Sequence, residues 1–148
     1  MVSQKWLVMI VSIELLLYSL ASGALWLVLV ALVHRKVARW ARIDREVPRE
    51  LIDDSGMAGM AVQFFMELVF LVVIPTMAYA LFSMILPLTG LRTGLAVGLI
   101  AFTLGAAPCI IGLAMQLRFS LLYLTYFLAG MLLKILGTLG IIAYLYSL

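Results

Sequence analysis

The stretch AGMLLKILGTLG, residues 129–140, places Lys134 in the middle of an otherwise apolar run. A run of about 20 apolar residues is long enough to cross the hydrocarbon of a bilayer as a helix. A lysine at the centre of such a helix costs roughly 2.5–3.5 kcal/mol, so we expect Lys134 to face protein rather than lipid. Gly130, Gly137 and Thr138 share its helix face, and small or polar residues are typical of a helix–helix contact.

Three further apolar runs accompany this one, and the chain as a whole is a membrane protein by composition. Of its 148 residues, 66% are hydrophobic and 11% are charged, against about 25% charged in soluble domains. The apolar runs are continuous rather than alternating, which excludes a strand barrel. We therefore predict an all-α integral membrane bundle of four transmembrane helices in a single domain, 1–148, with spans at about 6–33, 57–86, 91–115 and 119–147.

The first apolar run could be read as a cleaved secretion signal, because Lys5 precedes it and Ser22, Gly23 and Ala24 are small. However, the apolar run continues directly beyond these residues. A cleaved signal has no need of such a continuation, so we expect a retained helix.

The basic residues predict the orientation of the bundle. The loop 34–56 and the connection between the third and fourth spans carry seven Lys and Arg residues, whereas the other side carries Lys5 and Arg92. Basic connections stay in the cytoplasm, which places both termini on the outer side. We expect the first helix to continue through HRKVARWARIDRE, residues 34–46, until Pro48 ends it.

The basic part of this loop has two interpretations. It could bind anionic lipid headgroups, because basic and aromatic side chains lie together beside the membrane. It could instead serve only to fix the topology. The candidate headgroup-binding residues are Arg35, Lys36, Arg39, Trp40 and Arg42.

Lys134 needs an acidic partner, and two apolar runs each contain a glutamate. Glu14 lies in the first span and Glu67 in the second. Each is displaced from Lys134 by roughly 7 Å along the membrane normal, in opposite directions, so either could reach it. Gln63 is one helical turn from Glu67 and could complete its hydrogen bonding. We predict one Glu–Lys ion pair inside the bundle.

The ion pair has a structural and a functional interpretation. It could lock the register of the helices, as buried polar groups do in coiled coils. Alternatively, Glu14, Glu67, Lys134 and Gln63 could line a pathway for an ion or solute, because intramembrane ionisable groups commonly mark such pathways.

Glycines mark the expected helix contacts. Gly94, Gly98, Gly105 and Gly112 recur on one face of the third span, so we expect that helix to pack along nearly its whole length. Its partner is either the fourth helix, through Gly130 and Gly137, or the third helix of another chain. Two prolines, Pro75 and Pro108, should kink the second and third helices.

Several functional classes find no support in the sequence. Cys109 is the only cysteine and His34 the only histidine, which excludes an intrachain disulfide and leaves too few ligands for an ordinary zinc site. We predict no metal and no cofactor. A Ser/His/Asp set would need His34, to which we assign an ordinary interfacial role, and no phosphate-binding loop is present, so we predict no enzyme. No basic stripe with exposed aromatics points to nucleic acid.

The residues Gly23-Ala24-Leu25-Trp26, leading into the basic segment, give a faint resemblance. The chain resembles the uncharacterised families of small four-helix bacterial membrane proteins that carry such a stretch in their first helix. The resemblance implies the fold and a bacterial inner membrane, and it implies no activity.

Our functional expectation is a small channel or carrier for an ion or small solute, acting as a homo-oligomer because four short helices barely enclose a pathway. The alternative is a non-catalytic subunit that scaffolds a larger membrane complex or binds lipid for it. The partners expected are the lipid bilayer and either further copies of the chain or other membrane subunits.

Overall fold

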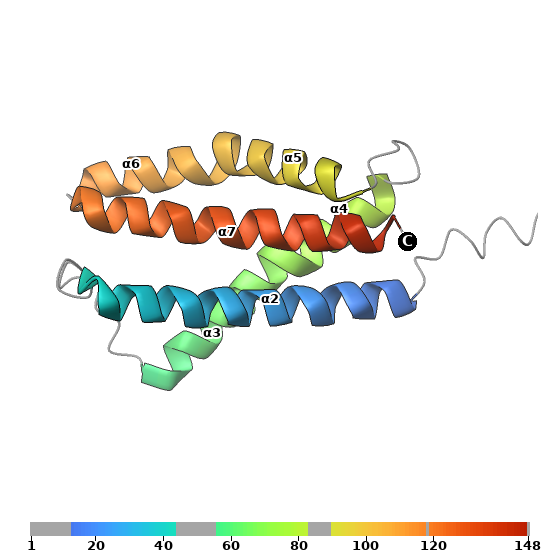
Figure 1. Cartoon of the computed structure of the whole chain (residues 1–148), viewed down its shortest axis with the longest axis horizontal. Helices are drawn as coiled ribbons and strands as arrows, with labels where there is room; N and C mark the ends of the chain where they lie inside the picture. Colours follow the sequence, from blue (N-terminus) through green and yellow to red (C-terminus); the bar gives the residue numbers. More distant parts are fainter. Residues whose placement is uncertain (1–12, 44–55, 83–89, 118, 148) are drawn as a thin grey trace, which may run out of the picture.

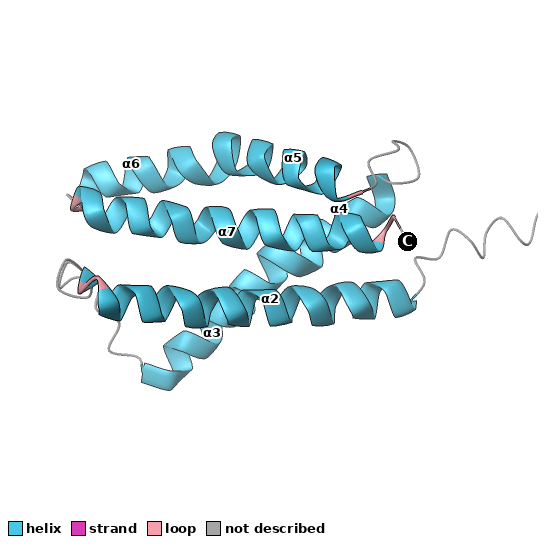
Figure 2. Cartoon of the chain, viewed as in Figure 1, coloured by secondary structure: helices cyan, strands magenta, loops and turns pink. Residues whose placement is uncertain are grey.

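The computed structural model describes residues 13–43, 56–82, 90–117 and 119–147, and these are almost entirely helical (Figures 1 and 2). Four helices are long and apolar enough to cross a membrane, which confirms the all-helical class and indicates a membrane protein. The elements are α2 (Ile13–Trp40), α3 (Gly56–Leu68), η3 (Val69–Val73), α4 (Ile74–Phe82), α5 (Leu91–Ala101), η4 (Phe102–Ala106), α6 (Ala107–Leu117) and α7 (Leu121–Leu145).

The last helix, α7, is the centre of the bundle (Figure 1). It packs against α2 on one side and against α5 on the other, while α3, η3 and α4 form one continuous helix that crosses α2 and α7 obliquely. Accordingly, α7 contains more buried residues than any other helix of the described chain, whereas α3 contains none. We call the end where α2 finishes the loop end, and the end where α2 begins the far end.

The first helix ends earlier than we predicted. It finishes at Trp40, and Arg42 then adopts a left-handed backbone with φ of 56°, which an α-helix cannot contain. The expected continuation of this helix to residue 46 is therefore wrong. Residues 44–55, which include Pro48 and the remainder of the loop, lie outside the described residues.

Both membrane prolines are preceded by a widened turn. The Ile74 N–H bonds the Val69 carbonyl, and the Ala107 N–H bonds the Phe102 carbonyl, so both bonds span five residues instead of four. Pro75 and Pro108 follow immediately. Proline has no N–H, and its ring clashes with the carbonyl four residues earlier. A π turn before the proline accommodates both defects within a continuous helix.

The widened turn in the third helix breaks its glycine stripe. A Cβ placed on Gly94 would lie 2.5 Å from the Ala143 Cβ and from the Leu139 carbonyl oxygen, so this glycine is in close contact with α7. A Cβ on Gly98 would lie 3.1 Å from Leu136 Cδ2 and 3.3 Å from Leu136 Cα, so this glycine also contacts α7, less tightly than Gly94 does. Beyond η4, the buried residues of α6 are Ile110 and Ala114.

Gly105 and Gly112 do not continue this contact with α7, and of the two partners that we considered for them only a helix of another chain is left. Both are exposed, and a Cβ on either would meet no atom within 4 Å. The extra residue of the π turn shifts the following helix face by about 100°, because an α-helix turns once in about 3.6 residues. Our prediction from the glycine spacing assumed that the third span is an uninterrupted α-helix.

We predict that Gly94→Ala lowers the stability of the protein while Gly112→Ala does not. The added methyl at position 94 overlaps α7 backbone, and overpacking of this kind typically costs about 1–3 kcal/mol. At position 112 the methyl has free space, and alanine favours helix over glycine. The measurement is thermal unfolding of the two variants in the same detergent. Equal melting temperatures would contradict the α5–α7 contact.

Candidate functional site

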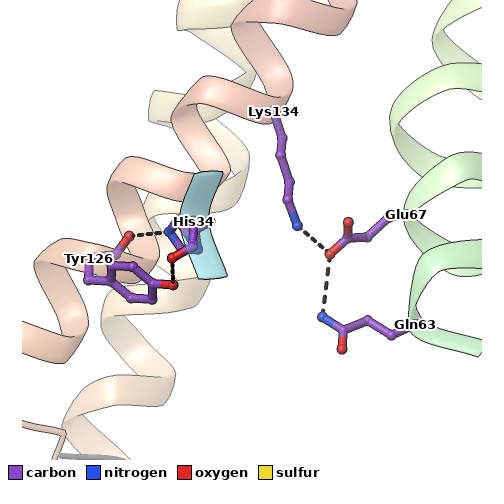
Figure 3. A network of polar contacts seen from close by, with 5 residues as sticks. All are labelled: His34, Gln63, Glu67, Tyr126 and Lys134. Atoms are coloured by element: carbon purple, nitrogen blue, oxygen red, sulfur yellow. Dashed lines mark hydrogen bonds and ion pairs between the residues drawn. The ribbon is translucent and has the colours of Figure 1, made fainter. Parts of the chain in front are cut away.

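The buried lysine forms the ion pair predicted for it. Lys134 Nζ lies 2.6 Å from Glu67 Oε1, and the two side chains are 14% and 19% exposed (Figure 3). Lys134 occupies the middle of α7, and Glu67 lies near the end of α3, just before the widened turn. The inward orientation of Lys134 and the Glu–Lys pair are confirmed. Glu14 is the second residue of α2, and its side chain lies outside the described residues.

One carboxylate oxygen accepts both of the hydrogen bonds that Glu67 receives here. Gln63 Nε2 donates to the same Glu67 Oε1 at 3.4 Å, from one turn earlier on α3 (Figure 3). Thr138 shares the face of Lys134 but does not join the pair, because its hydroxyl donates to the carbonyls of Lys134 and Ile135 within α7. The site is therefore an ammonium, a carboxylate and an amide on two helices.

The ion pair lines a cavity of about 280 Å³ between α2, α3 and α7. Its wall is mostly aliphatic and aromatic, and a second cation, Arg35, stands toward its loop end. The lining residues are Val28, Ala31, Leu32 and Arg35 from α2, Met60, Gln63, Phe64 and Glu67 from α3, and Lys134 from α7.

A second polar contact joins α2 to α7 near this cavity. The His34 and Tyr126 rings stack with centroids 3.7 Å apart and planes 17° from parallel. Their hydrogen bonds are reciprocal: His34 Nε2–H donates to the Tyr126 carbonyl at 3.0 Å, and the Tyr126 hydroxyl donates to the His34 carbonyl at 2.8 Å (Figure 3). The ring stacking and the two hydrogen bonds hold α2 and α7 together near their loop ends.

Trp26 makes the next contact along the same seam. Its indole N–H donates to the Leu133 carbonyl at 3.1 Å, and its ring lies directly over Gly137. Gly130 similarly faces the His34 ring. A side chain on either glycine would collide with these rings, so both glycines make room for large side chains of α2.

Sequence reasoning assigned these glycines to the wrong neighbour. Gly130 and Gly137 were candidates for contact with the third helix, but they face α2, and the third helix meets Gly140 instead. From the sequence we also assigned His34 an ordinary interfacial role, and we did not predict Tyr126 as its partner. A usable signal was present: Gly130 and Gly137 are seven residues apart in α7, and Trp26 and His34 are eight apart in α2, a spacing that keeps each pair on one helix face.

The basic end of α2 is open to its surroundings. Arg35, Lys36, Arg39 and Trp40 are all exposed, as is Arg42 beyond the helix, and Trp40 is 87% exposed. Their side chains are therefore free to meet a lipid surface. Among the described residues, no three His, Cys, Asp or Glu side chains lie close enough to hold a metal ion.

Comparison with known proteins gives no match: no family model, no curated protein and no solved structure is similar to this chain.

We predict that removing one partner of the ion pair is more harmful than removing both. Lys134→Met leaves an uncompensated carboxylate, and breaking a buried pair in this way costs about 3–5 kcal/mol. Glu67→Met combined with Lys134→Met removes both desolvated charges and should restore the stability of the protein to near or above its original value.

The measurement is a double-mutant cycle of thermal or chemical unfolding in detergent, with Arg92→Gln as a matched control. Arg92 is an exposed cation at the far end of the bundle. Additive losses in the double variant would show that the two charges do not interact.

Proposed function

We propose that this protein is a small channel or carrier that moves an ion or small solute across a membrane, with Lys134 and Glu67 in its pathway. The ion pair lining the cavity at mid-helix depth carries this proposal. Well-packed apolar residues stabilise a bundle as well as a buried ion pair does, so packing alone gives little reason to keep one. Ionisable groups inside a membrane commonly mark ion and substrate pathways.

The proposed orientation places the loop end in the cytoplasm and both termini outside, which for a bacterium is the inner membrane. The excess of Lys and Arg around the loop end supports it. The cavity then faces the cytoplasmic half of the bilayer, because Arg35 lies near the loop end of α2. Arg35, Lys36, Arg39, Trp40 and Arg42 would meet anionic headgroups at that surface.

We expect a homo-oligomer, because a single bundle offers little enclosure for a pathway. Glu67 belongs to the second span, and only 6% of an 18-residue apolar stretch of this span is buried within the chain. Further copies would complete the wall around this helix. Gly105 on η4 and Gly112 on α6 are exposed and leave room for the close approach of another helix. Glu14 remains a candidate for the far end of the pathway.

A second candidate function is a lipid-binding or scaffolding subunit. Two apolar cavities on either side of Trp26 favour it: one of about 280 Å³ toward the loop end and one of about 420 Å³ toward the far end. Aliphatic walls of this kind accommodate an acyl chain, whereas they offer a hydrated ion nothing.

Flux through proteoliposomes distinguishes these functions. Wild-type protein should move protons or small ions across a sealed bilayer. The double variant Glu67→Met, Lys134→Met should transport at least about tenfold more slowly, because a charged site becomes apolar. Arg92→Gln is the control with unchanged flux. Absence of flux from the folded wild type, with co-purification of a fixed membrane partner, would instead support the scaffold.

A cysteine-labelling experiment tests the orientation. In a Cys109→Ala background, Ser147→Cys should react with a membrane-impermeant maleimide added to intact cells, because it lies at the outer end in our proposal. Asp53→Cys in the basic loop should react only after the membrane is opened. The reverse pattern would invert the topology.

A further inference from the structure

An apolar groove follows the contact between α2 and α7, which run side by side (Figure 1). Two rings of α2 are wedged against glycines of α7: the His34 ring faces Gly130, and the Trp26 ring lies over Gly137. Beside these rings the two helices leave a hollow of about 280 Å³. We call it the seam groove, and its aliphatic wall includes Leu29, Val33 and Val37 from α2 and Ala129 and Leu133 from α7.

The seam groove suits hydrocarbon. Its aliphatic side chains are exposed at the surface that would face lipid. The polar groups beside them are already engaged: the Trp26 indole N–H donates to the Leu133 carbonyl, and His34 and Tyr126 bond each other's main chain. A polar ligand would lose its hydration there and gain little in return, whereas an acyl chain loses nothing.

The seam groove is about as long as one leaflet of a bilayer is thick. Trp26 and Val37, which line its two ends, are eleven residues apart and therefore about 16 Å apart along α2. Half of the hydrocarbon core of a bilayer measures about 15 Å. Trp26 lies at the middle of α2 and Val37 near its loop end. One acyl chain from the leaflet at the loop end matches this length.

Two exposed side chains extend the rim of the seam groove to the loop end. Leu29, Val33, Lys36 and Trp40 follow one another at intervals of four, three and four residues, so they share one side of α2. Lys36 and Trp40 are both exposed. An ammonium binds phosphate, and a tryptophan ring prefers the level of the lipid headgroups. A phosphate and an acyl chain can therefore be bound on the same side of this helix.

The charge of this helix end favours an anionic lipid. The last seven residues of α2 include Arg35, Lys36 and Arg39 and no acidic residue. A phospholipid without net charge carries a cation next to its phosphate, and the basic helix end repels that cation. A headgroup with net negative charge is attracted without this cost.

We propose that the seam groove binds one anionic phospholipid, with an acyl chain between α2 and α7 and the phosphate at Lys36 and Trp40. The proposal gives the lipid-binding candidate function a lipid class and a site. It does not depend on transport, because the ion-pair cavity opens on another side of α2, where Val28, Leu32 and Arg35 line it.

Native mass spectrometry of the full-length protein in detergent tests the choice of lipid. The probes are phosphatidylglycerol and phosphatidylcholine with identical acyl chains, added in equal amounts. We expect one saturable site that binds phosphatidylglycerol at least about tenfold more tightly. Equal affinity for the two lipids overturns the proposal. A dimer that excludes phosphatidylglycerol assigns the groove to a second copy of the chain and also overturns it.

A pair of charge variants tests the position of the phosphate. Lys36→Gln should weaken phosphatidylglycerol binding about fivefold, the effect of one basic residue near a charged lipid. Arg35→Gln removes the same charge from the side of α2 that lines the ion-pair cavity. It should weaken binding less than about twofold at about 0.15 M salt, because a helix is about 10–12 Å across and the Debye length is about 8 Å. Equal losses would mean diffuse attraction and would overturn the site.

A second pair of variants tests the position of the acyl chain. Ala129→Phe fills the seam groove while every cation remains, and it should weaken phosphatidylglycerol binding at least about tenfold. Ala101→Phe, at an exposed alanine of α5, is the matched control and should bind as the wild type does. Thermal unfolding checks that both variants fold. Unchanged binding by a folded Ala129→Phe variant overturns the proposal.

Tryptophan fluorescence locates the chain in an unaltered groove. The double variant Trp6→Phe, Trp40→Tyr keeps an aromatic ring at the loop end and leaves Trp26 as its one tryptophan. In nanodiscs of phosphatidylcholine, a small fraction of phosphatidylglycerol with brominated acyl chains should quench Trp26 more than the same fraction of brominated phosphatidylcholine. Equal quenching by the two lipids overturns the proposal.

Flux measurements keep this proposal separate from transport. Selective binding of phosphatidylglycerol by a wild type that shows no flux supports the lipid site and overturns transport. Flux through a wild type that binds the two lipids equally supports transport and overturns the lipid site.

Discussion

The electrostatic cost of Lys134 constrains the arrangement of the bundle. An ammonium in the middle of an apolar helix must be surrounded by protein and matched by a counter-ion, because lipid can provide neither. The helix that carries it, α7, is accordingly the one on which α2 and α5 pack from two sides. The counter-ion comes from the helix that is otherwise the least embedded, since α3 has no buried residue in its described length. The ion pair is the polar contact that ties α3 to the bundle centre.

Much of this arrangement could be predicted because it follows from periodic patterns and from charge. Long apolar runs gave four helices, and the cost of a central lysine gave its inward orientation. The close contacts of Gly94 and Gly98 followed from small residues at intervals of four. The choice of Glu67 as the partner did not follow, because Glu14 and Glu67 are displaced from Lys134 by similar axial distances. Which helix neighbours α7 at that depth is a tertiary property.

Other features escaped prediction for two physical reasons. Helical periodicity assumes about 3.6 residues per turn, and the π turn before Pro108 invalidates it halfway along the third span. That single irregularity turned Gly105 and Gly112 outward. The second reason is sequence distance: His34 and Tyr126 meet across 92 positions, and no local pattern in either segment identifies the other. The only signal in the sequence is the pair of glycines, Gly130 and Gly137, which indicate where α7 makes room for large side chains of another helix.

The π turn before Pro75 affects the direction in which the Glu67 side chain points. In an unbroken α-helix, residues five apart point about 140° away from each other. Glu67 and Val72 are five apart, yet one reaches Lys134 and the other lies against Gly23, so both are directed into the bundle. The wide turn lets one helix present its carboxylate and its tightest packing contact on a common side. Moving Pro75 to another position in the helix would turn the Glu67 carboxylate away from the Lys134 ammonium, although neither ionisable residue would be changed.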